Sequence, residues 1–201
     1  MPSTGYLPSD GPALSLIPVI RQRFGTFRGL VRLALSYPQV AFGLSSGNPF
    51  DPAAVRRLVF VCQGNICRSA FAEAVARRAG LRAVSVGLST TPGRPAHPPA
   101  IAAAQSLGYD LQVHSATDLP DYKPQPGDLL LVMEVRQLAR LSADPRLRDV
   151  PRTLLGRWTR PMLPHLHDPY GLDDSYMMQC LTRIERAVAR LSVSFPGARL
   201  S

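Results

Sequence analysis

The chain has 201 residues, of which 45% are hydrophobic and 18% are charged, so its composition is that of a folded globular protein and excludes a disordered or collagen-like chain. Its 23 Lys and Arg residues outnumber its 14 Asp and Glu residues, and the resulting net charge of +9 favours an anionic partner without indicating a fold. The three cysteines are too few, and odd in number, for a disulfide framework. They fit a reducing compartment, where a thiol is either reactive or buried.

The first 56 residues contain many prolines and glycines and no strand-like run. Within them, residues 20–37 alternate arginines with apolar side chains, although Gly25 and Gly29 weaken a helix there. The apolar residues that a helix would place on one face are Phe24, Phe27, Val31 and Leu35. We expect this helix to pack on the rest of the chain. The alternative is a basic helix on an anionic membrane surface or on a partner.

Export and membrane insertion are not expected. A secretory signal begins with positive charges and continues with an unbroken apolar stretch. Residues 1–10 have no positive side chain, and Arg21 and Arg23 interrupt the apolar stretch that follows. No run approaches the roughly 18–20 apolar residues that span a bilayer. The sequence therefore predicts a cytoplasmic protein.

From residue 58 onward, short apolar runs alternate with helical patterns. The predicted strands are Leu58–Cys62, Ala83–Val86, Asp128–Met133 and Arg152–Leu155. The predicted helices are Ser69–Ala79 with Ser69 as N-cap, Pro98–Leu107, Val135–Leu141 and Asp174–Leu191. This alternation predicts an α/β fold, in which helices cover both faces of a parallel sheet.

The loop from Cys62 to Ser69 reads Cys-Gln-Gly-Asn-Ile-Cys-Arg-Ser and joins the first strand to the first helix. Gly64 and Asn65 tolerate left-handed backbone angles, so the loop can direct successive N–H groups into one concavity. The helix N-terminus adds its positive dipole end, and the planar guanidinium of Arg68 matches two phosphate oxygens. Because all these groups stabilise negative charge, they predict a bound phosphoryl group and an attacking thiolate at Cys62.

The segment Val59–Ser69 resembles the signature of the low-molecular-weight protein tyrosine phosphatases, and the resemblance covers residues 58–194. It implies a three-layer α/β/α sandwich with a four-stranded parallel sheet and a phosphate-binding loop after the first strand. We therefore expect a catalytic domain at residues 57–201, preceded by an N-terminal extension at residues 1–56.

The same resemblance implies a role for each residue of the loop. Cys62 would be the nucleophile, Arg68 would bind the phosphoryl group, and Ser69 would assist the thiolate. The other residues expected to contact the substrate in the loop are Gln63, Gly64, Asn65, Ile66 and Cys67. The resemblance also implies that Cys67 protects Cys62 from over-oxidation through a reversible disulfide. Ala70 departs from the family, which usually has proline there, and this affects the entry into the helix.

The pair Asp168-Pro169 precedes the last predicted helix. A phosphocysteine pathway needs a proton for the leaving group and later a base for the attacking water. The proline restricts Asp168 to an extended backbone, and the family also carries its general acid in an Asp-Pro loop. We expect Asp168 to be that acid, with Tyr170 lining the cleft and His114 contacting Asn65 as a similarly placed histidine does in the family.

A metal site is the alternative for this region, because His165 and His167 stand close to Asp168. Side chains two residues apart converge only in an extended loop, and the sequence shows no second group of ligands. We expect neither a metal nor a cofactor. Cys180, within the last predicted helix, is expected to be a buried structural thiol.

Two other enzyme classes resemble the same loop. Thioredoxin-coupled arsenate reductases need two further cysteines in mid-chain, and there is none between Cys67 and Cys180. Phosphoarginine phosphatases have a threonine where this chain has Ile66, and an aliphatic wall suits a phenyl ring better. Residues 89–94 lack the aromatic that often stands in the cleft, and Gly171 replaces a second aromatic, so we expect a more open cleft.

A module that binds phosphotyrosine without turnover would have lost Cys62, Arg68 or Asp168, and all three are present. We expect a phosphotyrosine-bearing protein as partner, and the resemblance implies bacterial tyrosine kinases that control polysaccharide export. Nucleic acid is not expected, because the aromatic residues are few and do not interleave with a basic stripe. Peripheral membrane contact through residues 20–37 remains the alternative role of the extension.

Overall fold

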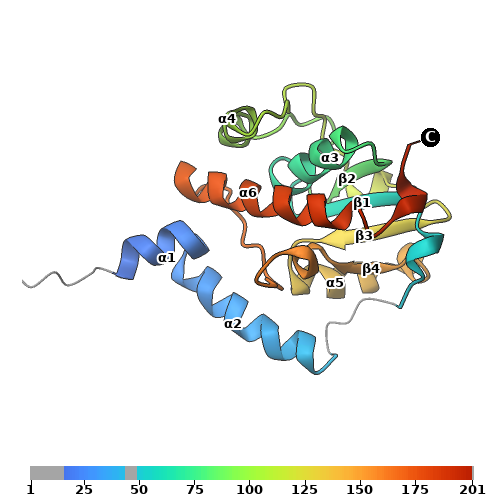
Figure 1. The fold of residues 1–201 in the computed structure, drawn as a ribbon, viewed down its shortest axis with the longest axis horizontal. Helices are drawn as coiled ribbons and strands as arrows, with labels where there is room; N and C mark the ends of the chain where they lie inside the picture. Colours follow the sequence, from blue (N-terminus) through green and yellow to red (C-terminus); the bar gives the residue numbers. More distant parts are fainter. Residues whose placement is uncertain (1–15, 44–48, 201) are drawn as a thin grey trace, which may run out of the picture.

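The structure is a computed structural model that describes residues 16–43 and 49–200. Its centre is a four-stranded sheet with the order β2-β1-β3-β4, in which every pair of neighbours is parallel (Figure 1). The strands are β1 (Arg57–Cys62), β2 (Ala83–Gly87), β3 (Asp128–Val132) and β4 (Arg152–Leu154). Because the strands are parallel, their carboxyl ends meet at one edge of the sheet.

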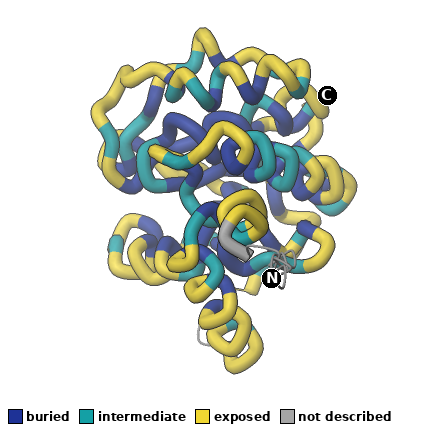
Figure 2. Tube along the Cα trace, turned by 90° about the vertical axis from the view of Figure 1, so that its left-hand side faces the viewer, coloured by how far each residue is buried: buried dark blue, intermediate teal, exposed yellow. Residues whose placement is uncertain are grey.

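Helices cover both faces of the sheet, so the predicted three-layer fold is confirmed. The helices of the catalytic part are α3 (Arg68–Arg78), α4 (Pro98–Ser106), α5 (Val135–Ser142) and α6 (Asp174–Leu191). Alternate residues of β1 point to opposite faces: Leu58 and Phe60 pack with α3 and α6, whereas Val59 and Val61 pack on the side of α5. Figure 2 shows the buried residues gathered in the middle of the molecule, with exposed residues around them.

The predicted elements agree closely with the observed ones, and α6 has the predicted bounds. One detail is wrong: the first helix begins at Arg68, its N-cap position is Cys67, and Ser69 lies inside the helix. The hydroxyl of Ser69 does not cap the helix, because it donates a hydrogen bond to the sulfur of Cys62 at 3.0 Å. A residue that matches an N-cap pattern has thus been recruited by the site.

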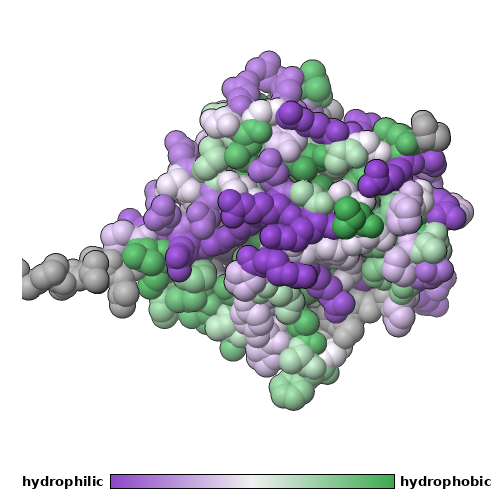
Figure 3. Space-filling view, in the orientation of Figure 1, coloured by the Kyte–Doolittle hydropathy of each residue, from purple (hydrophilic) through white to green (hydrophobic). Residues whose placement is uncertain are grey.

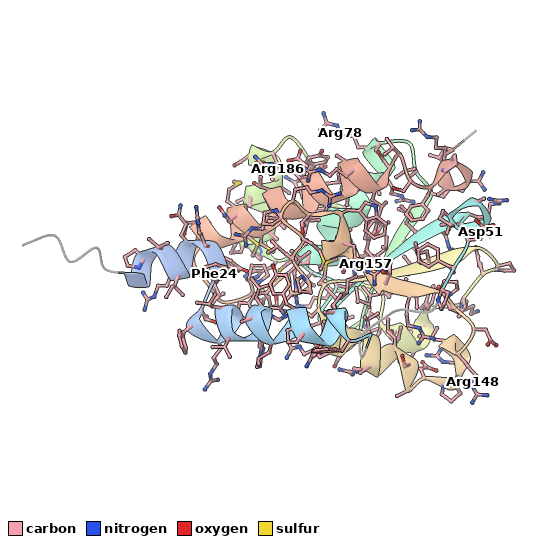
Figure 4. All side chains as sticks on the ribbon, turned by 60° about the horizontal axis from the view of Figure 1, so that its bottom comes forward. Phe24, Asp51, Arg78, Arg148, Arg157 and Arg186 are labelled. Carbon is pink, nitrogen blue, oxygen red and sulfur yellow. The ribbon has the colours of Figure 1, made fainter. Side chains whose placement is uncertain are left out.

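The N-terminal extension forms two helices, α1 (Leu16–Phe24) and α2 (Phe27–Ala41), where the sequence predicted one. Gly25 separates them with φ of 75°, a left-handed angle that glycine adopts without strain. Thr26 then caps α2, since its Oγ1 accepts a hydrogen bond from the N–H of Gly29 at 2.9 Å. Figure 4 shows Phe24 where α1 gives way to α2.

The described part of the extension contacts the catalytic part, but through a different face from the one the pattern indicated. The buried residues of α2 are Gly29, Leu33 and Ser36. By contrast, Phe27 is 68% exposed, Val31 39% and Leu35 59%. α1 lies against α6, and the hydroxyl of Tyr37 on α2 donates to the carbonyl of Met162 at 2.7 Å.

The docked face is the one with the smallest side chain. A Cβ atom on Gly29 would lie 2.9 Å from the imidazole ring of His167, so only glycine permits this approach. Phe27, Val31 and Leu35 consequently face the solvent. Figure 3 shows hydrophobic side chains at the surface over α1 and α2, below a band of hydrophilic side chains over α6. Of the helices described, none has both the length and the apolar character needed to cross a membrane.

Candidate active site

The loop after β1 lies at the carboxyl edge of the sheet. Asn65 adopts the left-handed conformation there, with φ of 53°. Gly64 does not, so only one of the two residues that tolerate a left-handed angle adopts it. One left-handed residue is sufficient to turn the loop, because the side chain of Asn65 is held by hydrogen bonds. Gly64 instead lines the pocket described below, where it presents backbone and no side chain.

Asn65 is fully buried and connects the loop to β2 and to the segment before residue 119. Its Nδ2 donates to the hydroxyls of Ser69 at 2.9 Å and Ser85 at 2.7 Å, and its Oδ1 accepts from the N–H of Thr117 at 2.8 Å. Nε2 of His114 lies 2.6 Å from the Asn65 carbonyl oxygen, so it donates to it. These contacts hold the backbone of the loop in its turned conformation.

The sulfur of Cys62 receives two hydrogen bonds from this loop. The N–H of Asn65 donates to it at 3.2 Å and the hydroxyl of Ser69 at 3.0 Å. All three cysteines are buried free thiols, but burial raises the pKa of Cys67 far above its usual value and that of Cys180 to about 12. The donors around Cys62 make it the thiol that can act as a thiolate.

Arg68 lies behind the loop and is only 1% exposed. Its Nη1 donates to Oε1 of Glu134 at 2.6 Å and to the carbonyl of Leu166 at 2.8 Å, and its Nη2 lies 2.6 Å from Oδ2 of Asp168. Burial opposes the charge, but the carboxylates of Asp168 and Glu134 outweigh it and raise the pKa of Arg68. Nε makes no hydrogen bond to any described residue and is available to an oxygen of a bound anion, whereas Nη2 forms the ion pair with Asp168.

Glu134 contacts Arg68 and was not singled out in the sequence analysis. It stands between β3 and α5, fully buried, and its backbone N–H donates to Oε1 of Gln137 at 3.2 Å. Burial alone would raise the pKa of Glu134, but the guanidinium of Arg68 lowers it to about 2. The available signal was a carboxylate directly after a buried strand, at the sheet edge that also carries Cys62. This signal points to Glu134 only once the strand order is known, because β3 lies next to β1 in the sheet.

Cys62 and Asp168 both line a pocket of about 210 Å³. The full lining consists of Cys62, Gln63, Gly64, Ile66, Cys67, Ser89, Arg94, Asp168 and Tyr170. Tyr170 is 52% exposed at its mouth, where its ring lies 4.8 Å from that of His97. Larger clefts of about 470 and 650 Å³ lie elsewhere on the surface, but neither contains a cysteine, so the chemistry and not the volume marks this site.

Several residues of the pocket were not singled out as candidates. Ser89 and Arg94 come from the connection between β2 and α4, and the guanidinium of Arg94 lies 6.0 Å from the ring centre of Tyr170. The sequence predicted an open cleft without an aromatic in this connection. The structure places a cation there instead, within reach of an anionic substrate.

The region of His165 and His167 shows direct contacts between the side chains. Nε2 of His165 lies 3.3 Å from Nδ1 of His167, and burial lowers the pKa of both rings, that of His165 to about 4. Among the residues that the structure describes, no group of three His, Cys, Asp or Glu side chains is arranged to hold a metal ion.

Comparison with known proteins agrees with this geometry. The model of the family described as low molecular weight phosphotyrosine protein phosphatase matches residues 57–199. The low molecular weight protein-tyrosine-phosphatase Wzb of Escherichia coli K12 is 32% identical over 133 residues, which cover 65% of this chain and 88% of Wzb. EpsP of Ralstonia solanacearum is 35% identical over 91 residues, which cover 44% of this chain and 63% of that relative.

Solved structures show the same fold. The tyrosine phosphatase Wzb from Escherichia coli K30, crystallised with sulphate, has a TM-score of 0.61 at 28% identity and covers 69% of this chain and 97% of its own. The YwlE arginine phosphatase of Geobacillus stearothermophilus has a TM-score of 0.59 but only 21% identity, covering 69% and 91%, and shares the fold alone. Because the family model matches residues 57–199, well over half of its length, the chain belongs to the low molecular weight phosphotyrosine protein phosphatases.

Proposed function

We propose that this chain hydrolyses phosphotyrosine in proteins through a phosphocysteine intermediate, with Cys62 as nucleophile and Asp168 as general acid. The observation that carries the proposal is the convergence of three groups: Cys62 and Asp168 line one pocket, and Asp168 lies 2.6 Å from the buried Arg68. Nucleophile, anion-binding fork and proton donor are therefore within reach of one phosphoryl group.

In the first step the thiolate of Cys62 attacks phosphorus, so that an S–P bond forms while the bond from phosphorus to the phenolic oxygen breaks. The loop N–H groups and the Nε and Nη2 donors of Arg68 bind the phosphoryl oxygens and stabilise their charge. This replaces Asp168 as the partner of the guanidinium. The freed carboxylate takes up a proton from water when the substrate binds, and it then gives this proton to the leaving oxygen.

In the second step the deprotonated Asp168 accepts a proton from water, whose oxygen attacks phosphorus. The S–P bond breaks, inorganic phosphate leaves, and Cys62 returns to the thiolate that Asn65 and Ser69 stabilise through their hydrogen bonds. One carboxyl thus serves as acid and then as base, as the two halves of the reaction require.

The role of Cys62 is tested by the substitution Cys62→Ser. We expect turnover of an aryl phosphate to fall to background, because a serine hydroxyl in this loop has no base to activate it. Cys180→Ser is the matched control, since Cys180 is buried in α6 outside the pocket, and it should retain activity. Undiminished hydrolysis by the Cys62 variant would refute the proposal.

The role of Asp168 is tested separately with Asp168→Ala. We expect kcat for an aryl phosphate to fall about 100-fold or more, within the usual contribution of a positioned general acid, while KM changes little. A leaving group of low pKa needs no protonation, so it should restore much of the lost rate. An unchanged kcat, or an equal loss for all leaving groups, would rule Asp168 out as the acid.

Phosphotyrosine is the substrate that the pocket favours over phosphoarginine. Ile66 contributes an aliphatic wall, and Tyr170 and His97 place rings at the mouth, so a flat phenyl ring finds apolar contacts there. Turnover of phosphotyrosine, phosphoserine and phosphoarginine peptides of one sequence, compared under one condition, decides the question. Faster turnover of phosphoarginine would assign the chain to the second activity.

The partner that fits this chemistry is a phosphotyrosine-bearing protein, and a tyrosine kinase is the candidate that the named relatives suggest. The cytoplasm is the compartment that suits the reaction, because Cys62 and Cys67 must stay reduced for attack. A trapping experiment with the inactive Cys62→Ser chain tests the partner: it should retain a phosphorylated kinase and release it when free phosphate is added.

The extension offers a second contact, with an anionic membrane surface. Phe27, Val31 and Leu35 form an exposed apolar row on α2, and the exposed Arg28 and Arg32 lie on the same helix. We expect the chain to sediment with anionic vesicles at low salt. A variant with serine at the three apolar positions should not sediment, because it has lost the side chains that would enter the membrane surface. Its fold should be retained, because these side chains are exposed. Equal sedimentation of the two proteins, or none by either, would remove this contact.

A further inference from the structure

A row of polar side chains connects the N-terminal extension to the residue that holds Arg68. It begins at Thr26 between α1 and α2, whose Oγ1 lies 3.1 Å from Nε2 of His167. Nδ1 of His167 lies 3.3 Å from Nε2 of His165, and Nδ1 of His165 lies 3.6 Å from Oε2 of Glu134. The other oxygen of Glu134 accepts the hydrogen bond from Arg68. Five side chains therefore form one continuous path from the extension to the active site.

The direction in which each hydrogen bond of this path is donated follows from the ionisation of Glu134. Glu134 is ionised at neutral pH and can only accept. Both imidazoles are neutral there, because burial lowers their pKa, so each ring carries one N–H. Nδ1 of His165 faces the carboxylate at 3.6 Å, and the negative charge there favours the N–H on this nitrogen, which leaves Nε2 of His165 as acceptor for Nδ1–H of His167. Nε2 of His167 must then accept, and its hydrogen-bond partner among the described residues is the hydroxyl of Thr26, which has a proton to donate.

Thr26 is suited to this position. Its oxygen already accepts the N–H of Gly29 as the cap of α2, so its single hydroxyl proton is free for His167. The contact depends on glycine at two places, because a Cβ atom on Gly25 would lie 3.0 Å from the ring of His167 and one on Gly29 2.9 Å. The turn between the two helices is thus built to meet this imidazole.

We propose that Thr26 is a positioning residue: its hydroxyl sets the tautomer and orientation of His167, and through His167 and His165 the extension holds both the loop that carries Asp168 and the carboxylate that holds Arg68. This rests on the proposed function, which gives Arg68 and Asp168 their roles. It also assigns the extension a part in catalysis that the residues matched by the family do not contain, since the matched region begins at residue 57.

Arg23 of α1 and Arg183 of α6 line the small cavity beside the ring of His167. The charged groups that act most strongly on its pKa are Glu134, Arg68, Asp168 and, from α2, Arg32. Only Glu134 and Asp168 favour a proton on the ring, and burial and the two arginines oppose it. The neutral ring with its N–H on Nδ1 is therefore the form that the whole environment supports near pH 7.

The direct test is nitrogen NMR of the imidazoles in the full chain, which has four histidines and so four rings to assign. His165 and His167 should both carry the proton on Nδ1. Thr26→Asp keeps an acceptor for the N–H of Gly29 but has no proton to donate, so it should move the proton of His167 to Nε2. Thr26→Ser keeps both functions and should resemble the wild type. A wild-type His167 with its proton on Nε2 would overturn the proposal.

The kinetic test uses the same variants with an aryl phosphate. For Thr26→Asp and Thr26→Val we expect kcat to fall about 3- to 10-fold with little change in KM, the size of one lost neutral hydrogen bond. Tyr37→Phe is the matched control, because it removes another hydrogen bond between α2 and the catalytic part without touching the histidines.

If Tyr37→Phe causes the same loss, or if Thr26→Asp retains full kcat, the extension has no specific positioning role and the proposal fails. The NMR result does not depend on turnover. An inactive wild-type chain with the expected tautomers would therefore contradict the proposed function alone, and an active chain with the wrong tautomers would contradict only this inference.

Discussion

At the scale of single residues, the site is organised around a buried cation. A guanidinium away from water is costly unless charged partners and hydrogen bonds compensate it. Arg68 has Glu134 on one side and Asp168 on the other, but the two carboxylates differ: Glu134 is fully buried, whereas the side chain of Asp168 is 30% exposed in the pocket. The buried carboxylate can serve as the permanent partner, and the accessible one is free to exchange with substrate.

The buried histidine predicts how stability depends on pH. His165 has a pKa of about 4 in the folded chain against 6.5 as its ordinary value, so the unfolded chain binds a proton more readily. Its contribution to the free energy of unfolding is full above pH 6.5 and is lost as the pH falls toward 4. Glu134, with a pKa of about 2 against 4.5, adds a second loss below pH 4.5.

Urea unfolding at pH 7.5 and at pH 5 measures this effect. The wild type should lose stability between the two, and His165→Gln should lose less, because the glutamine cannot take up a proton. His97→Gln is the comparison: burial also lowers the pKa of His97, but that ring is only partly buried, so this variant should change the loss less. An equal loss for the wild type and the His165 variant would contradict the assignment.

At the scale of elements, helix α2 shows that an apolar pattern does not by itself decide which face is buried. Phe27, Val31 and Leu35 are exposed to solvent, whereas the face with Gly29 and Leu33 packs inward. The reason is distance: the loop of His167 approaches so closely that only a residue without a Cβ fits. Close backbone approach is a recurrent reason for glycine within a helix.

This packing reverses the usual effect of a substitution. Gly→Ala inside a helix normally stabilises a protein by about 0.5–1 kcal/mol. At Gly29 the added methyl would meet the carbonyl of Phe24 and the ring of His167, so we expect the free energy of unfolding to fall by about 1–3 kcal/mol, the range for overpacked sites. Urea unfolding measures it, with the exposed Gln39→Ala on the same helix as control. A gain in stability at Gly29 would show that the helix is not held at this distance.

At the scale of the whole molecule, the extension and the catalytic part share surface. α1 lies against α6, and α2 reaches the loop between β4 and α6 through Tyr37 and Thr26. The division at residue 56 stays a prediction, but the contacts indicate that the two parts do not behave independently. The net positive charge is spread over both, and only Arg68 has an assigned task in the reaction.

Removal of residues 1–48 is the test at this scale. The four-stranded sheet does not depend on the extension, so the shortened chain should fold. Its urea midpoint and its kcat should both fall, because Tyr176 and His167 lose the cover of Gly25 and Gly29. Phe50 remains and keeps its contact with Phe195. If the shortened chain matches the full one in both measurements, the extension is an independent appendage.

The sequence by itself determined those features that depend on neighbours along the chain. The loop from Cys62 to Ser69 could be identified because one short segment contains the nucleophile, the residue of left-handed conformation and the arginine. The strands and helices could be placed because buried parallel strands are short continuous apolar runs, and helices end at recognisable residues. Asp168 was found for the same reason, as an Asp-Pro pair before a helix.

Only the tertiary structure decided what holds these residues and which face of the extension is buried. Glu134, Ser85, Thr117 and Arg94 reach the site from four separate segments, and nothing in their local sequence distinguishes them from ordinary polar residues. Burial and charge pairing arise between segments that are far apart in the chain, so they depend on strand order and on helix docking. For that reason the nucleophile was visible in the sequence, whereas the path from Thr26 to Arg68 appears only in the folded molecule.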